Sequence, residues 1–358
     1  MIIQRFLAGH LARGWLAVFT VLTSLFALLA LIDEVDNLNE RYTFLDALAY
    51  VGLTTPQRVL ELSPVAAALG TILAFAGLTR TSELVVIRAT GFSMRQLVLL
   101  CTPPTLLLAL LLGLSSEFLV ASMHQRGETQ RTVLRSGNFD LLAGHSLWSS
   151  RGTRLFNVRN LRIGQIPEGI SLYEFNEHSE LLTAIDAARA EPMKDRNWKL
   201  IDVRRKDWTD GKVSTVVLPE LELGPFWSAA ELPALGQSLA AMSPSALYEY
   251  SSYLEETGQE YQRVRMAFWQ KIALPVSAVA MVLLTTVIGL GFGTIRSSAF
   301  GFRVLGGAIL GVGFYLLTQI FHTGGQLLGL DQSVVVLIPI CLAVLLAGLV
   351  AVMSRGPR

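Results

Sequence analysis

Among the ionisable residues of this chain, Glu83 has the most unusual setting. It lies near the start of a short apolar run in the segment 78–96, LTRTSELVVIRATGFSMRQ. Ser82 or Thr81 can cap a helix there, Glu83 then falls in the first turn, where the helix dipole favours an anion, and Gly91 ends the helix. A helix of about nine residues is marginal in water. We therefore expect it to dock against another surface.

The chain lacks the common catalytic motifs. Its sequence contains no GxxxxGK[ST] phosphate loop, no HExxH zinc motif and no GxSxG nucleophile elbow. The five histidines are scattered, and the two cysteines, Cys101 and Cys341, lie in apolar runs without a CxxC neighbour. We expect no catalysis, no metal site and no cofactor bound by this chain.

The composition is that of a membrane protein. Of 358 residues, 52% are hydrophobic and 16% are charged, and the net charge is +1. The mean hydropathy is +0.48. Such a composition is outside the usual soluble range, and no basic tract suggests a nucleic-acid partner.

Six apolar runs approach or exceed the length of a membrane span, about 17–25 residues. They are residues 15–32, 59–78, 97–120, 268–292, 304–321 and 334–353. The first is a retained span and not a signal peptide, because no small-residue cleavage site follows it. Five prolines are expected near the ends of these runs, where helices tolerate them best: Pro56, Pro64, Pro103, Pro104 and Pro275.

The short connections alternate in charge. Those after the second and fourth spans and both termini carry arginines, whereas the first connection is acidic and the fifth has no Lys or Arg. By the positive-inside rule, both termini are cytosolic and the long polar block after the third span faces outward.

This polar block has the turn signals and alternation of a small all-β domain. Candidate strands cover residues 153–160, 170–176, 182–190, 198–205 and 214–221. Their spacing of about a dozen residues favours a small sandwich or an open roll. Ser243 and Pro244 then open an amphipathic helix to about residue 257.

Charged residues within the spans lie toward the outward-facing ends and leave the midplanes nearly uncharged: Arg58, Glu61, Glu117 and Lys271. An ion-coupled transporter usually needs an ionisable group near the midplane. An apolar interior with charges at its rim better suits an amphiphile, although rim charges also simply snorkel. Arg126, Arg131 and Arg135 after the third span could bind phosphates or be ordinary solvated arginines.

The segment 80–93, RTSELVVIRATGFS, resembles the coupling-helix signature of the LptF/LptG permease family. Residues 169–177, GISLYEFNE, and 296–304, with RS and GFRV, are two further similar strings. The first of these is more like the G-type than the F-type permease. The resemblance covers essentially the whole chain. It implies an α-helical membrane protein with six transmembrane helices and an inserted all-β, jellyroll-like periplasmic domain.

The resemblance also implies a function and partners. Two permeases, one of them F-type, and a dimer of the cytosolic ATPase LptB would form an exporter. This exporter draws lipopolysaccharide from the outer leaflet of the Gram-negative inner membrane, with ATP and Mg bound by the ATPase. The lipid would pass through the β domain to periplasmic LptC/LptA-type jellyroll proteins. A secondary lipid transporter and a membrane-anchored scaffold or receptor for a periplasmic partner are the alternatives.

The resemblance, together with the charge and hydropathy pattern of the chain, indicates site residues and domains. The ATPase-coupling set is Arg80, Glu83, Leu84, Ile87, Arg88, Gly91 and Phe92, and the lipid-binding set is Arg41, Glu61, Arg131, Arg135 and Lys271. Asp33 departs from the lysine of some G-type members, which puts a first-span phosphate contact in doubt. The expected divisions are residues 1–125 with the coupling helix at about 80–92, the β domain at 126–242, a connecting helix at 243–265 and the last three spans at 266–358.

Overall fold

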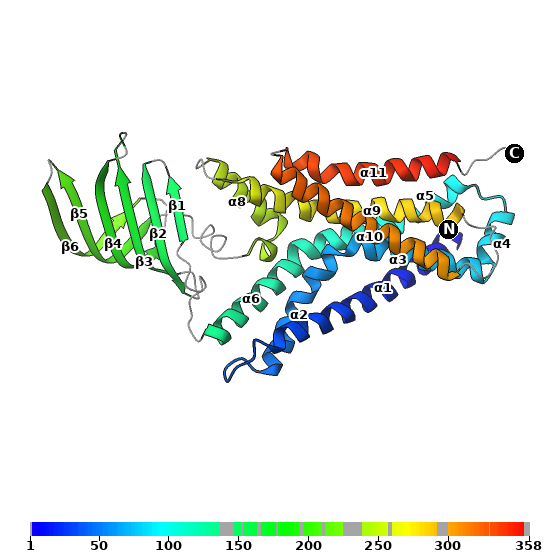
Figure 1. Ribbon diagram of the computed structural model, residues 1–358, viewed down its shortest axis with the longest axis horizontal. Coiled ribbons are helices and arrows are strands. Elements are labelled where there is room, and N and C mark those ends of the chain that lie inside the picture. Colours follow the sequence, from blue (N-terminus) through cyan, green and yellow to red (C-terminus); the bar gives the residue numbers. More distant parts are fainter. Residues whose placement is uncertain are drawn as a thin grey trace. The chain divides into compact units, whose positions relative to one another are not determined.

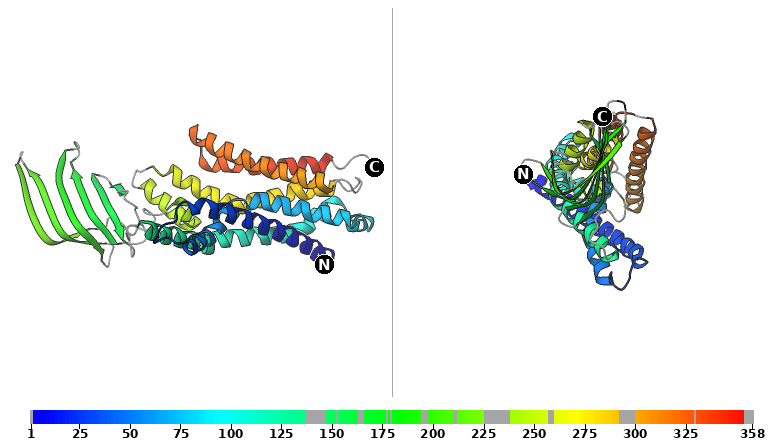
Figure 2. Two further views of the ribbon diagram at one scale, coloured as in Figure 1. Left: turned by 60° about the horizontal axis from the view of Figure 1, so that its bottom comes forward. Right: turned by 90° about the vertical axis from the view of Figure 1, so that its left-hand side faces the viewer.

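The computed structural model contains two compact units (Figures 1 and 2). The helical unit comprises Met1–Ile32, Thr54–Ala121 and Arg265–Arg358, and the mixed unit comprises Asp33–Leu53 and Ser122–Val264. The structure describes residues 2–136, 147–151, 153–162, 166–176, 178, 180–193, 197–209, 212–224, 238–256, 260–291, 300–328 and 330–353.

The described helices precede and follow the strands in the chain. The first group is α1 (Ile2–Val35), α2 (Phe44–Glu61), α3 (Ser63–Arg80), α4 (Glu83–Ala89), α5 (Met94–Leu114), the π-helical η1 (Ser115–Val120) and α6 (Ala121–Ser136). The second group is the 3₁₀ turn η3 (Leu239–Ala241), α8 (Pro244–Glu256), α9 (Gln262–Gly291), α10 (Phe300–Leu327) and α11 (Gln332–Met353). In the described part of the chain, six helices are long and apolar enough to cross a membrane, and they match the six predicted runs.

Several helix bounds differ from those predicted. The first helix starts at Ile2 and not at residue 15, α2 was not predicted, and α6 continues to Ser136, so residues 126–136 are helical and do not belong to the β sheet. The periodicity of an apolar run marks only the part of a helix that meets an apolar environment. Polar turns that extend a helix beyond this part were therefore missed.

The expected placement of the prolines is wrong for all but one. Pro64 lies in the first turn of α3, but the other four lie inside helices α2, α5 and α9. Beside the Pro103–Pro104 pair, the hydroxyl of Thr105 donates to the carbonyl of Cys101 at 2.8 Å. This is not a carbonyl freed by proline, because the missing N–H groups of Pro103 and Pro104 free the carbonyls of Leu99 and Leu100. Neighbouring helices and local adjustments satisfy such groups in membrane helices.

Three side chains spaced four residues apart on α1 form one apolar face. Leu7, Leu11 and Trp15 are buried in a cluster that also contains Phe75 and Leu78 of α3. The Trp15 indole N–H donates to the Thr71 hydroxyl at 2.9 Å. The spacing places these residues on one stripe of the helix, and the stripe fixes α1 against α3.

Glycines allow this close approach of α1 and α3. A Cβ atom on Gly70 would lie 2.8 Å from the backbone of Trp15, and one on Gly14 would lie 2.3 Å from the carbonyl oxygen of Gly70. The two backbones therefore pack directly, as small residues allow in membrane helices.

We expect Gly70→Ala to destabilise the protein by about 1–3 kcal/mol, because the added methyl group overpacks a backbone contact. The matched control is Gly77→Ala in the same helix, where a Cβ would meet nothing within 4 Å. This control should be neutral or stabilising because alanine favours helix. Thermal unfolding of the detergent-solubilised permease complex measures both, and equal melting temperatures would exclude the backbone contact as the cause.

The mixed unit contains a six-stranded antiparallel sheet (Figure 1). Its strands are β1 (Leu147–Arg151), β2 (Arg154–Arg162), β3 (Ile166–Phe175), β4 (Leu181–Pro192), β5 (Trp198–Thr209) and β6 (Lys212–Leu223). They follow one another in the order β1-β2-β3-β4-β5-β6. This single sheet corresponds to the open roll and not to the two-sheet sandwich. The sequence predicted the last five strands but missed β1.

A row of interrupted pairing crosses five of these strands. The register places Gly169 opposite Arg159 and Ala188, and Asp202 opposite Ala188 and Pro219, yet none of these positions forms a ladder pair. Gly169 and Asp202 have positive φ values of 65° and 59°, and Pro219 has no N–H to donate. We call this line of residues the interrupted row; such irregularities bend strands locally.

The interrupted row reverses which alternate side chains face the core of the sheet. On one side, Ala187 pairs with Val203, and on the other Ala190 pairs with Leu200. All four side chains are buried in the same apolar cluster, although their positions along each strand differ by an odd number of residues. The row thus lets both halves of the curved sheet (Figure 2) face one interior.

The helix predicted from Ser243 and Pro244 is α8. The backbone N–H of Ala246 donates to the hydroxyl of Ser243 at 3.2 Å, so the serine caps the helix as expected. Tyr253 of α8 packs against the apolar cluster of the sheet.

Candidate functional site

The segment predicted as a coupling helix is α4, and it is shorter than the expected residues 80–92. It covers seven residues, Glu83–Ala89. Ser82 holds the N-cap position with φ 59°, but its side chain makes no capping hydrogen bond, so the predicted cap is wrong. Gly91, with φ 91°, follows the last turn and ends the helix as predicted.

The apolar residues of α4 divide into two faces. Leu84 and Ile87 are buried in the cluster that contains Leu7 and Leu11 of α1. Val85 and Val86 remain 51% and 63% exposed. The predicted pair Leu84 and Ile87 therefore anchors the helix, and the exposed pair, which sequence reasoning did not select, is available to a partner.

The remaining predicted coupling residues lie around this helix. Arg80 is exposed at the end of α3, and Phe92 packs partly buried against the same cluster. The guanidinium of Arg88 donates to the backbone carbonyl of Leu290. Because the last carbonyls of a helix have no partner within it, this bond satisfies the end of α9 and ties α4 to it.

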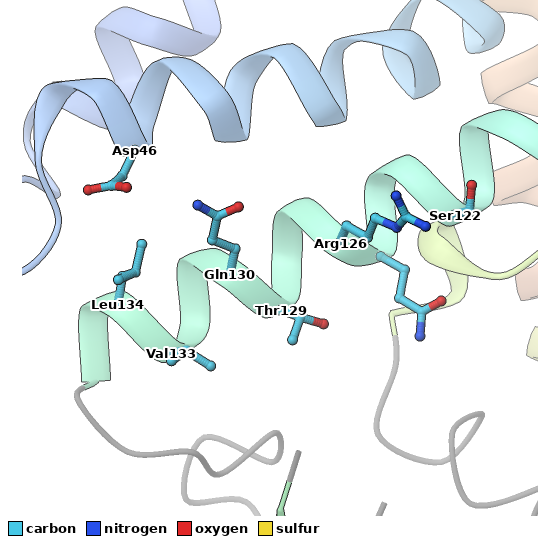
Figure 3. A pocket seen from close by; sticks show the side chains of 8 residues that line it. Asp46, Ser122, Arg126, Thr129, Gln130, Val133 and Leu134 are labelled. Atoms are coloured by element: carbon cyan, nitrogen blue, oxygen red, sulfur yellow. The ribbon is translucent and has the colours of Figure 1, made fainter. Parts of the chain in front are cut away.

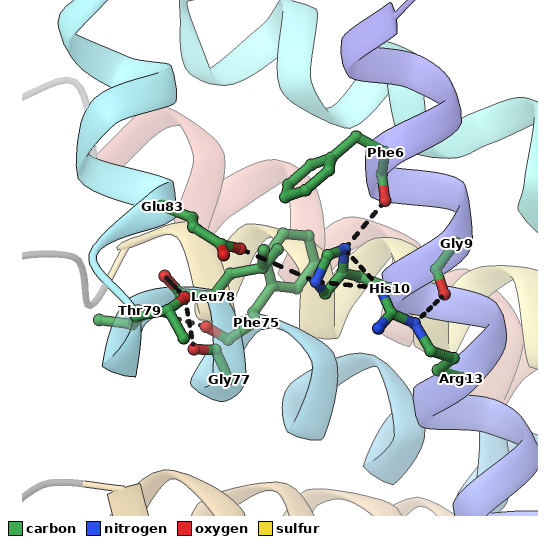
Figure 4. Close-up of polar contacts among 10 residues, drawn as sticks. Phe6, Gly9, His10, Arg13, Phe75, Gly77, Leu78, Thr79 and Glu83 are labelled. Carbon is green, nitrogen blue, oxygen red and sulfur yellow. Dashed lines mark hydrogen bonds and ion pairs between the residues drawn. The ribbon is translucent and has the colours of Figure 1, made fainter.

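Glu83 points toward α1 (Figure 4). Its Oε2 atom lies 3.8 Å from Nε2 of His10. The ring of His10 also lies 3.2 Å from the guanidinium of Arg13, and Arg13 Nε donates to the carbonyl of Gly9 at 3.1 Å. A carboxylate, a histidine and an arginine from two helices thus meet at the start of α4.

A second polar cluster joins three segments of the mixed unit. Arg131 of α6 donates to both carboxylate oxygens of Glu34, at 2.6 and 3.1 Å. The Glu34 side chain is only 6% exposed. The guanidinium also lies 5.0 Å from the ring centroid of Tyr50, and the Tyr50 hydroxyl donates to Glu128 at 3.0 Å. Arg131 is therefore already bound within the protein.

Two groups near this cluster have shifted pKa values. Burial and the negative charge of Glu34 raise the pKa of Tyr42 to about 12. The hydroxyl and backbone N–H of Thr43 hold the pKa of Asp46 below its ordinary value. At neutral pH, Tyr42 is thus a neutral group beside the buried carboxylate, and Asp46 is an anion at the start of α2.

A groove of about 680 Å³ lies between the start of α2 and α6 (Figure 3). Its lining residues are Asp46, Ser122, Gln125, Arg126, Thr129, Gln130, Val133 and Leu134. Six of these eight side chains carry a polar group, including the cation of Arg126, but apolar atoms contribute most of the surface of the groove. The lining is therefore amphiphilic.

The other predicted lipid-binding residues are divided between the two units. Arg41 and Arg135 are exposed within the mixed unit. Lys271 is only 6% exposed, and it interacts electrostatically with Glu61 and Glu117 in the helical unit. Glu61 accepts a hydrogen bond from Gln57 at 2.8 Å. Lys271 therefore lies in the helix packing and not at an open rim.

The chain is similar to known proteins over nearly its whole length. The sequence profile of the family described as "Lipopolysaccharide export system permease LptF/LptG" matches residues 5–353. The lipopolysaccharide export system permease protein LptG of Haemophilus influenzae is 28% identical over 336 residues, which cover 90% of this chain and 91% of that protein. The LptG protein of Escherichia coli K12 is 28% identical over 344 residues, which cover 94% of each chain.

Proposed function

Since the chain belongs to the LptF/LptG family of lipopolysaccharide export system permeases, we propose that it is the G-type permease subunit of an ABC exporter. In this proposal, it extracts lipopolysaccharide from the outer leaflet of the inner membrane and passes it through its β domain toward the outer membrane. A separate cytosolic ATPase supplies the energy.

The proposed coupling role rests on the two different faces of helix α4. Between two candidate spans, this helix is anchored inward by Leu84 and Ile87 and keeps Val85 and Val86 exposed. Glu83 adds a carboxylate at its start. An exposed apolar pair beside an anion suits insertion into a groove of a partner protein.

The arginine-rich connections support an orientation with both termini and α4 in the cytosol. The sequence itself contains no phosphate loop, so ATP and Mg would bind an LptB-type ATPase dimer. An F-type permease would complete the heterodimer. The buried apolar cluster of the sheet supports acyl-chain transfer through the β domain to LptC/LptA-type jellyroll proteins.

The function is tested by co-expressing this chain with an F-type permease and an LptB-type ATPase. The proposal predicts a stable complex whose ATP hydrolysis rises with lipopolysaccharide and whose substrate release requires ATP. Transport driven by an ion gradient without the ATPase would favour a secondary transporter. Binding of a periplasmic protein without any transport would favour a scaffold.

For the lipid head group, the exposed arginines are better candidates than Arg131. A phosphate would have to compete with Glu34 for the guanidinium of Arg131, whereas Arg41 and Arg135 are exposed. Arginine binds phosphate through a planar pair of N–H groups. We propose that Arg41 and Arg135 make the first contact with the head group.

We expect Arg135→Gln to lower photo-crosslinking of lipopolysaccharide at the periplasmic mouth about tenfold, because the loss of one hydrogen bond to a charged group lowers affinity by about this factor. Arg204→Gln removes the same charge from an exposed position in β5 and is the control. If both variants crosslink as the unmodified protein does, Arg135 makes no head-group contact.

A further inference from the structure

The carboxylate of Glu83 has a partner on a different helix. Nε2 of His10 on α1 lies 3.8 Å from Oε2 of Glu83, and the two side chains are 22% and 42% exposed. That oxygen is itself buried and accepts no hydrogen bond from any group in the described part of the chain. A closure of about 1 Å would bring the two atoms to hydrogen-bond distance.

The other contacts of His10 hold its ring in this orientation. Nδ1 lies 3.0 Å from the carbonyl oxygen of Phe6 and 3.3 Å from the guanidinium of Arg13. Nε2 lies between the guanidinium of Arg13, at 3.2 Å, and Glu83. The Phe6 ring packs against the imidazole, with centroids 4.4 Å apart. Figure 4 shows this side of α1 turned toward Glu83.

The same turns of α1 form the apolar surface on which α4 packs. Leu7 and Leu11, on either side of His10 in the sequence, are buried in one cluster with Leu84 and Ile87. A displacement of α4 therefore acts on α1 through this apolar surface and through the pair of His10 and Glu83. Only the second contact involves Glu83, the residue proposed to meet the ATPase.

We propose that His10 is a positioning residue for coupling, which holds the Glu83 carboxylate toward α1 so that force applied by the ATPase at Glu83 is passed to the first span. This inference rests on the proposed coupling role of α4. It adds α1 to the coupling path and assigns a role to a histidine that the sequence alone does not distinguish.

The test uses the complete complex of both permeases and the ATPase in lipid nanodiscs. His10→Gln is expected to lower lipopolysaccharide-stimulated ATP hydrolysis about fivefold, the effect of losing one hydrogen-bonding contact. His10→Lys places a cation near Glu83 and should restore most of the stimulation. Arg5→Gln, which removes an exposed charge from the same helix, should leave the stimulation unchanged.

A double-mutant cycle with Glu83→Gln separates positioning from a general structural role. If His10 acts through Glu83, the double variant is no worse than Glu83→Gln alone. Independent effects that multiply would overturn the proposal, and so would full stimulation in His10→Gln. If Glu83→Gln is also fully stimulated, the coupling role of α4 itself fails, so the two failures are distinguishable.

Discussion

Glu83→Lys is expected to release the ATPase from the permease while leaving the permease inserted and folded. Removing one partner of a desolvated charge pair at an interface costs about 2–5 kcal/mol, so the affinity should fall about thirtyfold to several thousandfold. The folded core is spared because Glu83 is 42% exposed and lies beside the buried face of α4. Co-purification of the ATPase with the permease measures the loss.

The control for this prediction is charge reversal at an exposed carboxylate of the sheet, Glu222→Lys on β6. It changes the net charge of the chain equally and should retain the ATPase. Normal ATPase binding and lipopolysaccharide export by Glu83→Lys would show that α4 is only a connecting helix.

The second large effect concerns the ion pair of Glu34 and Arg131. Arg131→Met leaves a carboxylate that is 6% exposed without its cation. Breaking a buried pair in this way costs about 3–5 kcal/mol. We expect a clear fall in the melting temperature of the purified complex, whereas Arg135→Met, at an exposed position of the same helix, should cause little change.

The double variant Glu34→Leu, Arg131→Met tests the cause. Replacing both partners with apolar residues removes the uncompensated charge, and it often restores stability. Recovery of most of the lost stability assigns the effect to the pair. A double variant as unstable as Arg131→Met alone would instead point to the packing of Arg131 on Tyr50.

The sequence predicted the spans well because a bilayer demands length and apolarity, and both can be counted along the chain. It missed α2, where residues such as Asp46, Gln57 and Arg58 interrupt the apolar pattern. In α4, it selected the buried pair, Leu84 and Ile87, but not the exposed pair, Val85 and Val86. In a run of four apolar residues, 84–87, periodicity alone does not show which pair is buried.

The contacts of the candidate site required the structure. Glu34 and Arg131 are 97 residues apart in sequence, and His10 and Glu83 lie on separate helices. No local pattern encodes such pairings. The turn signal at residues 167–169 was visible in the sequence, but the meeting of Gly169 with Ala188, Asp202 and Pro219 in one row depends on the register of four strand pairs.

The interrupted row has a consequence for how this sheet can vary during evolution. In β4, β5 and β6, every second residue faces inward, and this alternation shifts by one residue at Ala188, Asp202 and Pro219. The number of residues on each side of the row is therefore constrained. Inserting or deleting one residue within β4, β5 or β6 would turn the apolar side chains beyond that point outward. Changes in strand length are therefore expected in matched pairs or at the turns, and homologous sequences should keep their gaps out of these strands.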